Sequence, residues 1–258
     1  MAIISLVIVI ISSCIIGSMT EIGGGIIMKP ILDFLGFFEV KEISLYSSLA
    51  LIGMSSMNLF LNRSRLKEMA WKIIGTLTLG AIIGGAVGHR VLMLLLRLLK
   101  QDDIVVIIQS GLLILLLSLT LFLMKKQFSM QLTFHGLLLI TIGFILGFFA
   151  AMLSIGGGPI NVAILLFIFG FPMNISALYS IMMIFFSQLS GFVTVSVTSG
   201  FAVYDLATLA IVFATGIAGG FIGSKASNLL SNEVTSRVFA FVLLGVICLN
   251  VINILKVM

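Results

Sequence analysis

Long stretches without charged side chains constrain the fold of this chain more than any other feature of its sequence. No Asp, Glu, Lys or Arg occurs between Lys126 and Asp205. Over all 258 residues, 9% are charged and 60% are hydrophobic, whereas soluble globular proteins carry about 25% charged residues. So few charges cannot cover the surface of a soluble protein. We therefore expect an all-α polytopic membrane protein, because helices satisfy their own backbone hydrogen bonds in lipid.

Several other functional classes are excluded by what the sequence contains. The net charge of +5 comes from 14 Lys and Arg against 9 Asp and Glu, but no basic cluster with interleaved aromatic residues indicates nucleic-acid binding. Cys14 and Cys248 form no metal-binding motif. No GxxxxGK[ST], HExxH or GxSxG sequence is present. We expect neither an enzyme nor a cofactor.

The apolar segments fall into two length classes. A membrane-spanning helix needs about 20 apolar residues, and the segments of that length are roughly 2–20, 43–62, 73–96, 104–124, 133–153, 175–198, 206–228 and 236–255. Two more segments, about 26–38 and 159–171, cover only about 20 Å each. Both follow a triple glycine. Short, glycine-interrupted segments at matching places in two halves are typical of a transporter binding site.

Three motifs recur in the same order in the two halves of the chain. They are Ile22-Gly23-Gly24-Gly25 with Ile155-Gly156-Gly157-Gly158, Tyr46-Ser47 with Tyr179-Ser180, and Gly84-Gly85-x-x-Gly88 with Gly219-Gly220-x-x-Gly223. The offset is 133 residues for the first two motifs and 135 for the third. Glycine motifs also pack membrane helices generally, but a nearly constant offset favours an internal repeat. We predict a single membrane domain with pseudo-symmetric repeats at 1–126 and 127–258, each with a glycine-broken helical hairpin and three long helices.

The distribution of cations predicts how the repeats are oriented. The connection 63–72 carries Arg63, Arg65, Lys67 and Lys72, whereas its counterpart at about 199–205 carries no Lys or Arg. Cationic loops lie on the cytoplasmic side of a membrane. The two connections are therefore expected on opposite sides, which makes the repeats inverted.

The glycine runs predict an anion-binding site. A helix that starts after a break has N–H groups without intrahelical acceptors and a partial positive charge. If the two breaks face each other, a small anion fits between them. The alternative is that each glycine run is only a packing kink. The candidate substrate-binding residues are Gly23, Gly24, Gly25, Gly156, Gly157, Gly158, Asn161, Ser47, Ser180 and Lys29; Ser or Asn at such places can instead cap a helix.

Glu21 and Lys29 flank the first glycine run, and ionisable residues inside a membrane are functional candidates. Three interpretations stay open. The two side chains form a structural ion pair, or Glu21 couples transport to protons while Lys29 binds the substrate, or both lie at the membrane interface.

The chain resembles the sulfite exporter TauE/SafE family of bacterial and archaeal membrane permeases. The resemblance rests on Gly23-Gly24-Gly25 followed by Pro30, Leu32 and Gly36, on Ser47-Ser48, on Gly216-x-x-Gly219-Gly220-x-x-Gly223, and on Arg237-Val238-Phe239-Ala240. The second half departs from the family pattern, because Pro159 directly follows its glycines and Ala163 stands at the expected proline position. The resemblance implies a multi-pass protein of the cell (inner) membrane that exports, or takes up, sulfite, sulfonates or related anions.

We therefore expect a secondary transporter, with export the favoured direction, that binds its anion at two half-helix N-termini and works by alternating access. The expected partners are the small anion, the lipid bilayer and a second copy of the chain in a homodimer, but no nucleic acid. The alternatives are an anion channel and a non-transporting membrane scaffold or assembly subunit.

Overall fold

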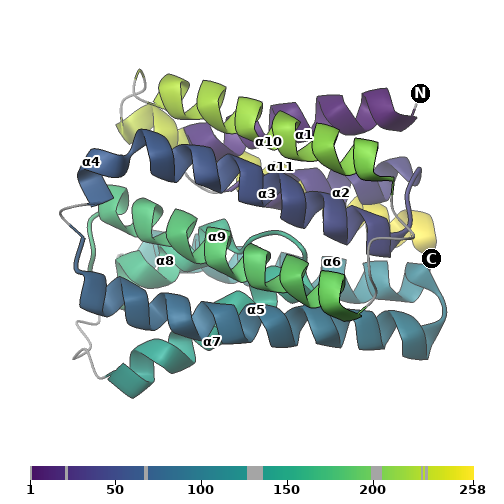
Figure 1. Ribbon diagram of the computed structural model, residues 1–258, viewed down its shortest axis with the longest axis horizontal. Coiled ribbons are helices and arrows are strands. Elements are labelled where there is room, and N and C mark those ends of the chain that lie inside the picture. Colours follow the sequence, from purple (N-terminus) through teal and green to yellow (C-terminus); the bar gives the residue numbers. More distant parts are fainter. Residues whose placement is uncertain are drawn as a thin grey trace.

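The computed structural model describes residues 2–20, 23–66, 69–126, 136–198, 205–227, 229 and 232–258, and every regular element in these ranges is a helix. The first half contains α1 (Ala2–Met19), α2 (Gly25–Leu35), α3 (Val40–Leu61), α4 (Arg63–Leu66), α5 (Trp71–Leu99) and α6 (Asp102–Lys126). The second half contains α7 (Gly136–Met152), α8 (Gly158–Phe167), α9 (Met173–Thr198), α10 (Leu206–Ser227) and α11 (Asn232–Val257). The long helices lie side by side along the long axis of the molecule (Figure 1).

Among the described residues, 7 helices are long and apolar enough to cross a membrane: α1, α3, α5, α6, α9, α10 and α11. This confirms the expectation of a polytopic helical membrane protein. The short helices α2 and α8 follow the two glycine runs as expected. The short α4, inside the cationic connection, was not expected, and the predicted span 133–153 begins in residues outside the described ranges.

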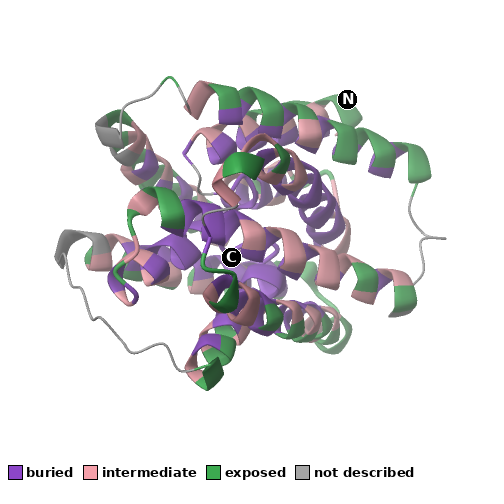
Figure 2. Cartoon of the chain, turned by 60° about the vertical axis from the view of Figure 1, so that its left-hand side comes forward, coloured by how far each residue is buried: buried purple, intermediate pink, exposed green. Residues whose placement is uncertain are grey.

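Buried residues fill the middle of the molecule, and exposed residues lie on its outer faces (Figure 2). Many exposed side chains are large and apolar; Leu115, Val197 and Phe241 are 64%, 80% and 75% exposed. Such faces would be unfavourable in water. They fit contact with lipid, as expected for membrane-spanning helices.

The α3 and α9 helices lie side by side and run in opposite directions. Ser48 of α3 bonds to Gln188 of α9, whereas Asn58, further along α3, shares a pocket with Ile181, which comes earlier in α9. The α3 and α9 helices are therefore antiparallel (Figure 1).

The glycine-rich faces of α5 and α10 make matching contacts with the opposite half. A Cβ atom added to Gly85 would lie 2.6 Å from the Ser187 carbonyl oxygen, and one added to Gly220 would lie 2.8 Å from the Met54 carbonyl oxygen. Met54 and Ser187 are 133 residues apart. The neighbouring glycines repeat this pattern, with Gly84 on Phe144, Gly88 on Phe148, Gly219 on Ile11 and Gly223 on Ile15. Each hairpin thus packs against a long helix of the other half.

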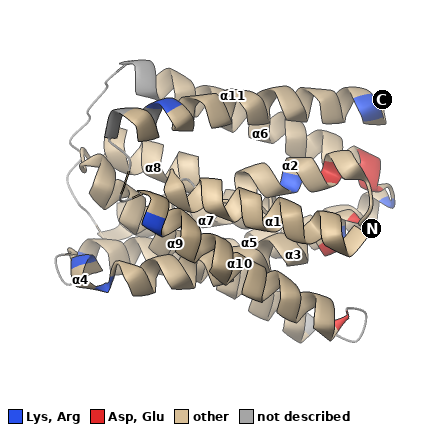
Figure 3. Ribbon diagram, turned by 90° about the horizontal axis from the view of Figure 1, so that it is seen from above, with Lys and Arg blue, Asp and Glu red and all other residues tan. Residues whose placement is uncertain are grey.

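Most charged residues lie at the two ends of the helix bundle, and Lys29 of α2 lies between them (Figure 3). One end, formed by α4, the end of α10 and the start of α11, carries Arg63, Arg65, Lys225 and Arg237. The other end, formed by the starts of α3 and α6 and the end of α5, carries Glu39, Glu42, Asp102 and Asp103 together with Lys41, Arg97 and Lys100.

Candidate functional site

The first helix break separates α1 from α2. Gly23 has φ +90°, a backbone conformation that residues with a side chain rarely adopt. Its amide donates to the Gly17 carbonyl at 3.1 Å, and Gly17 lies directly against the Gly24 backbone. The next helix begins at Gly25, and Gly24 offers no side chain to cap it. The first N–H groups of α2 have no acceptor inside that helix.

The second break, between α7 and α8, also leaves the start of a helix without a side-chain cap, but its backbone conformation differs from that of the first break. Ser154, Gly156 and Gly157 all have positive φ, at 56°, 75° and 73°. The Gly156 amide donates back to the Ala150 carbonyl at 3.3 Å. Again no side chain caps the new helix, and Pro159 lies in its first turn, where the missing N–H costs no intrahelical bond.

The two breaks lie against each other. A Cβ atom added to Gly25 would lie 2.6 Å from the Ile155 carbonyl oxygen, and one added to Gly23 would lie 3.9 Å from the Gly158 Cα atom. The backbones of the two halves meet at these glycines because no side chain separates them. The starts of α2 and α8 are thus brought together.

Two apolar side chains, at matching positions of α3 and α9, pack against glycines of both breaks. The Cδ1 atom of Leu51 would be 2.6 Å and 3.0 Å from Cβ atoms added to Gly25 and Gly156. Ile184, which is 133 residues after Leu51, approaches Gly156 and Gly23 in the same way, at 3.2 Å and 3.1 Å. Both side chains are fully buried. The glycine runs are therefore covered by apolar atoms in this conformation.

The predicted polar residues reach the first turns of the two short helices. The hydroxyl of Ser47 donates to Met28 Sδ at 3.4 Å, and that of Ser180 donates to the Gly158 carbonyl at 3.3 Å. Asn161 stands at the position equivalent to Met28 and is 2% exposed. Its Oδ1 atom has no hydrogen-bond partner among the described residues. An unsatisfied buried amide oxygen is costly; because it is an acceptor, Asn161 would contact an anion only through its amide NH₂ group.

Polar links between the halves were missed by the sequence reasoning. Ser44 and Ser154 share a hydrogen bond at 2.6 Å, and Ser48 donates to Gln188 Oε1 at 2.8 Å. The Gln188 amide group in turn donates to the Ala150 carbonyl at 3.5 Å. Ser44, Ser48 and Gln188 are ordinary polar side chains inside apolar helices, whereas Ser154 lies in the second break. Only the pairing of the helix faces distinguishes them.

Lys29 is bound to Asp33, a residue that the sequence reasoning did not consider. The Nζ atom lies 2.6 Å from Asp33 Oδ2, and the two side chains are 3% and 2% exposed. Lys29 is therefore buried instead of interfacial, and its ammonium group is engaged within α2. Glu21, the candidate for proton coupling, lies outside the described residues. The i,i+4 spacing of Lys29 and Asp33 was the signal that could have identified this pair.

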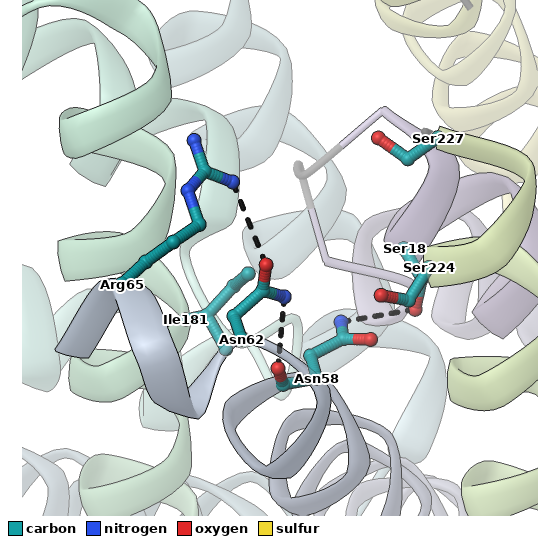
Figure 4. A pocket seen from close by; sticks show the side chains of 7 residues that line it. All are labelled: Ser18, Asn58, Asn62, Arg65, Ile181, Ser224 and Ser227. Carbon is teal, nitrogen blue, oxygen red and sulfur yellow. Dashed lines mark hydrogen bonds between the residues drawn. The ribbon is translucent and has the colours of Figure 1, made fainter. Parts of the chain in front are cut away.

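A polar pocket opens beside the first break, at the cationic end of the bundle (Figure 4). It is small, with a cavity volume of about 10 Å³, and is lined by Ser18, Asn58, Asn62, Arg65, Ile181, Ser224 and Ser227. Asn58 donates to Ser18 Oγ at 3.1 Å, and Arg65 donates to Asn62 Oδ1 at 3.5 Å. The Asn58 Oδ1 atom is buried without a partner among the described residues. Arg65 gives this pocket a positive charge.

Taken together, the two breaks offer hydrogen-bond donors and the positive ends of two helix dipoles. This chemistry suits an anion. The described residues contain no group of three His, Cys, Asp or Glu side chains that could hold a metal ion.

Comparison with protein families gives one match over nearly the whole chain. The family model described as Sulfite exporter TauE/SafE matches residues 5–250. No curated protein and no solved structure matches the chain.

Proposed function

The chain belongs to the sulfite exporter TauE/SafE family, and from this premise we propose that it is a secondary transporter that carries sulfite or a related sulfonate by alternating access. Membership makes it a multi-pass membrane transport protein. The observation that carries the proposal is the contact between the two glycine breaks, where Gly25 meets Ile155 and Gly23 meets Gly158. The anion would be held by the first amide groups of α2 and α8, with Ser47, Ser180 and Asn161 beside them.

The favoured direction is export, across the cell membrane of a bacterium or an archaeon, as is typical of this family. The repeats would be inverted, with the end that carries Arg63 and Arg65 inside the cell. The antiparallel course of α3 and α9 supports this arrangement. Single cysteines replacing Arg65 and Asp205 should be labelled from opposite sides of the membrane, and labelling of both from one side would refute the inverted topology.

The conformation described here is interpreted as occluded. Leu51 and Ile184 lie on the glycine runs, so an anion can reach the amides only after these side chains move. The pocket beside Ser18 and Arg65 would be the inner approach to the site, because its positive charge attracts anions. Rocking of one hairpin and its neighbours against the other half would then expose the site alternately to each side.

The proposal is tested by a thermal-shift screen of the purified protein with sulfite, sulfate, thiosulfate, taurine, sulfoacetate and carboxylates. A ligand present at about 100 times its Kd stabilises the native state by about 2.7 kcal/mol. We expect sulfite or a sulfonate to raise Tm and the carboxylates to leave it unchanged. A screen without any shift from a sulfur-containing anion would contradict the proposed substrate class.

The two alternative functions are separated from transport in liposomes. A carrier saturates and accelerates uptake of labelled anion when unlabelled anion is inside, whereas a channel shows no such counterflow. A scaffold shows no anion flux. We expect saturation and counterflow with the anion selected by the thermal-shift screen.

A further inference from the structure

A second polar site lies between α2, α6 and α11, next to the end of α7 at Met152 and Leu153. Its centre is the buried ion pair of Lys29 and Asp33, in which only one carboxylate oxygen, Oδ2, is bound by the ammonium group. Asp33 Oδ1 is buried and has no partner among the described residues. Removing both charges from water is costly, and leaving one carboxylate oxygen unsatisfied adds to that cost.

The neighbouring side chains supply more acceptors. The Gln109 amide nitrogen donates to the Met152 carbonyl at 2.7 Å, and the Asn253 amide nitrogen donates to the Pro30 carbonyl at 2.9 Å. These bonds fix which end of each amide is the oxygen. Both oxygens are buried and unpartnered within the described part of the chain. Gln109 is 3% exposed and Asn253 is 2% exposed.

Lys29, Asp33 and Gln109 meet at one narrow crevice that has no room for a water molecule, and Asn253 lies beside it through its bond to Pro30. The crevice is lined by Lys29, Pro30, Asp33, Gln109, Ser110, Leu113, Leu153 and Asn250. The unsatisfied atoms at and beside it are all acceptors, so an anion is excluded. A single carboxylate, already half-neutralised by Lys29, is too little charge for a divalent ion. Oxygen acceptors without a donor suit a small cation or a proton.

We propose that Asp33, together with Gln109, binds a small monovalent cation, either Na⁺ or a proton, that drives transport. The ion pair without the cation is neutral, and occupation of the site makes the cluster net positive. Asp33, where the cation binds, lies eight residues after Gly25, which is about 12 Å along the helix axis. A positive charge at this distance strengthens binding of an anion at the start of α2, and by linkage the anion strengthens binding of the cation.

This coupling rests on the proposed function, but cation binding itself does not. Two other charged groups lie near Asp33 in the described residues. Asp102 of α6 acts on it electrostatically and accepts a bond from the Val40 amide, and Lys256 of α11 donates to the Phe34 carbonyl. Neither is bonded to Asp33, so Asp33 is the residue to change.

The first experiment measures Tm of the purified protein without any anion substrate, in NaCl and in choline chloride at equal ionic strength, over a series of pH values. We expect Tm to depend on Na⁺ or, in its absence, on pH at values above the acid range in which Asp205 titrates, and this part of the dependence to be lost in Asp33→Asn. Dependence on Na⁺ identifies sodium, and dependence on pH alone identifies a proton. The matched control is Asp103→Asn, an exposed carboxylate in the first turn of α6, which should behave like the wild type. Equal Tm in all conditions, or an unchanged cation dependence in Asp33→Asn, overturns the proposal.

The second experiment tests coupling in liposomes. Asp33→Asn should lose anion accumulation driven by the cation gradient while retaining anion counterflow. If Asp33→Asn does not fold, Gln109→Leu, which removes the second unpartnered oxygen and keeps the ion pair, serves in its place. Gradient-driven accumulation that survives in the folded variant contradicts the coupling. Absence of anion flux in the wild type refutes the proposed function and leaves the cation-binding result standing.

Discussion

Asp205 shows at the scale of one residue how a helix end is stabilised outside the membrane. Its carboxylate accepts bonds from the Thr208 hydroxyl at 2.7 Å and from the Ala207 and Thr208 amides at 3.2 Å and 3.1 Å. These bonds, the Thr208 hydroxyl first, lower the pKa of Asp205 below its ordinary value of 3.8. Asp205 therefore caps the start of α10.

The lowered pKa of Asp205 predicts a pH-dependent stability. The carboxylate favours the folded state while it is ionised, so its contribution is fully present above the ordinary pKa of 3.8 and is lost as pH falls through the lower folded pKa. Asp205→Ala should have a lower Tm than the wild type at neutral pH, and the difference should close in strong acid. A thermal melt at each pH measures this. Thr208→Val, which removes one of the three bonds, should give a smaller difference, and a Tm gap that persists in strong acid would contradict the assignment.

At the same scale, the sequence identified some site residues and missed others. The glycines are recognisable because three in a row precede a short segment in each half. Lys29 was recognisable as a charge inside an apolar segment, but its partner is Asp33. Gln109 and Asn253 could not be found, because their importance comes from the contact of α6 and α11 with α2 and not from any local motif.

The helices pack as they do because glycine faces allow close backbone contact. Gly84 and Gly88 of α5 lie directly on the backbone of α7, at Phe144 and Phe148. The sequence predicted most helix ranges, because apolar length is a local property. Which helices touch was not predictable, because every apolar helix has several faces that can pack.

The close helix contacts at some glycines, and their absence at others, predict that glycine-to-alanine substitutions change the stability of the protein by different amounts. Gly84→Ala inserts a methyl group where there is no room and should destabilise the protein by about 1–3 kcal/mol. Gly219→Ala, its equivalent in α10, should do the same. Gly111→Ala, in α6, places its methyl group in open space and should be neutral or stabilising by about 0.5–1 kcal/mol. Thermal melts of the purified variants measure the three effects; equal Tm for Gly84→Ala and Gly111→Ala would show that the close packing is not important.

At the scale of the whole molecule, the two halves of the chain pack into each other. The α1 helix packs on α10, and α7 packs on α5, so each hairpin contacts a long helix of the opposite half. Leu51 and Ile184, one from each half, cover both breaks. The nearly constant offset of the motifs predicts an internal repeat, and this stays a prediction. The apolar cover by Leu51 and Ile184 could not be predicted, because the conformation along a transport cycle is not encoded in a local pattern.

The most direct test of the account is sulfite uptake into liposomes by the wild type, Gly25→Ala and Gly111→Ala. Both substitutions add one methyl group to a helical glycine, but only that at Gly25 pushes against the opposite break, at the Ile155 carbonyl. With all three proteins folded, we predict saturable uptake by the wild type and Gly111→Ala and a loss of uptake of at least about tenfold in Gly25→Ala, corresponding to about 1.4 kcal/mol. Equal uptake by all three proteins would contradict an anion site between the glycine breaks.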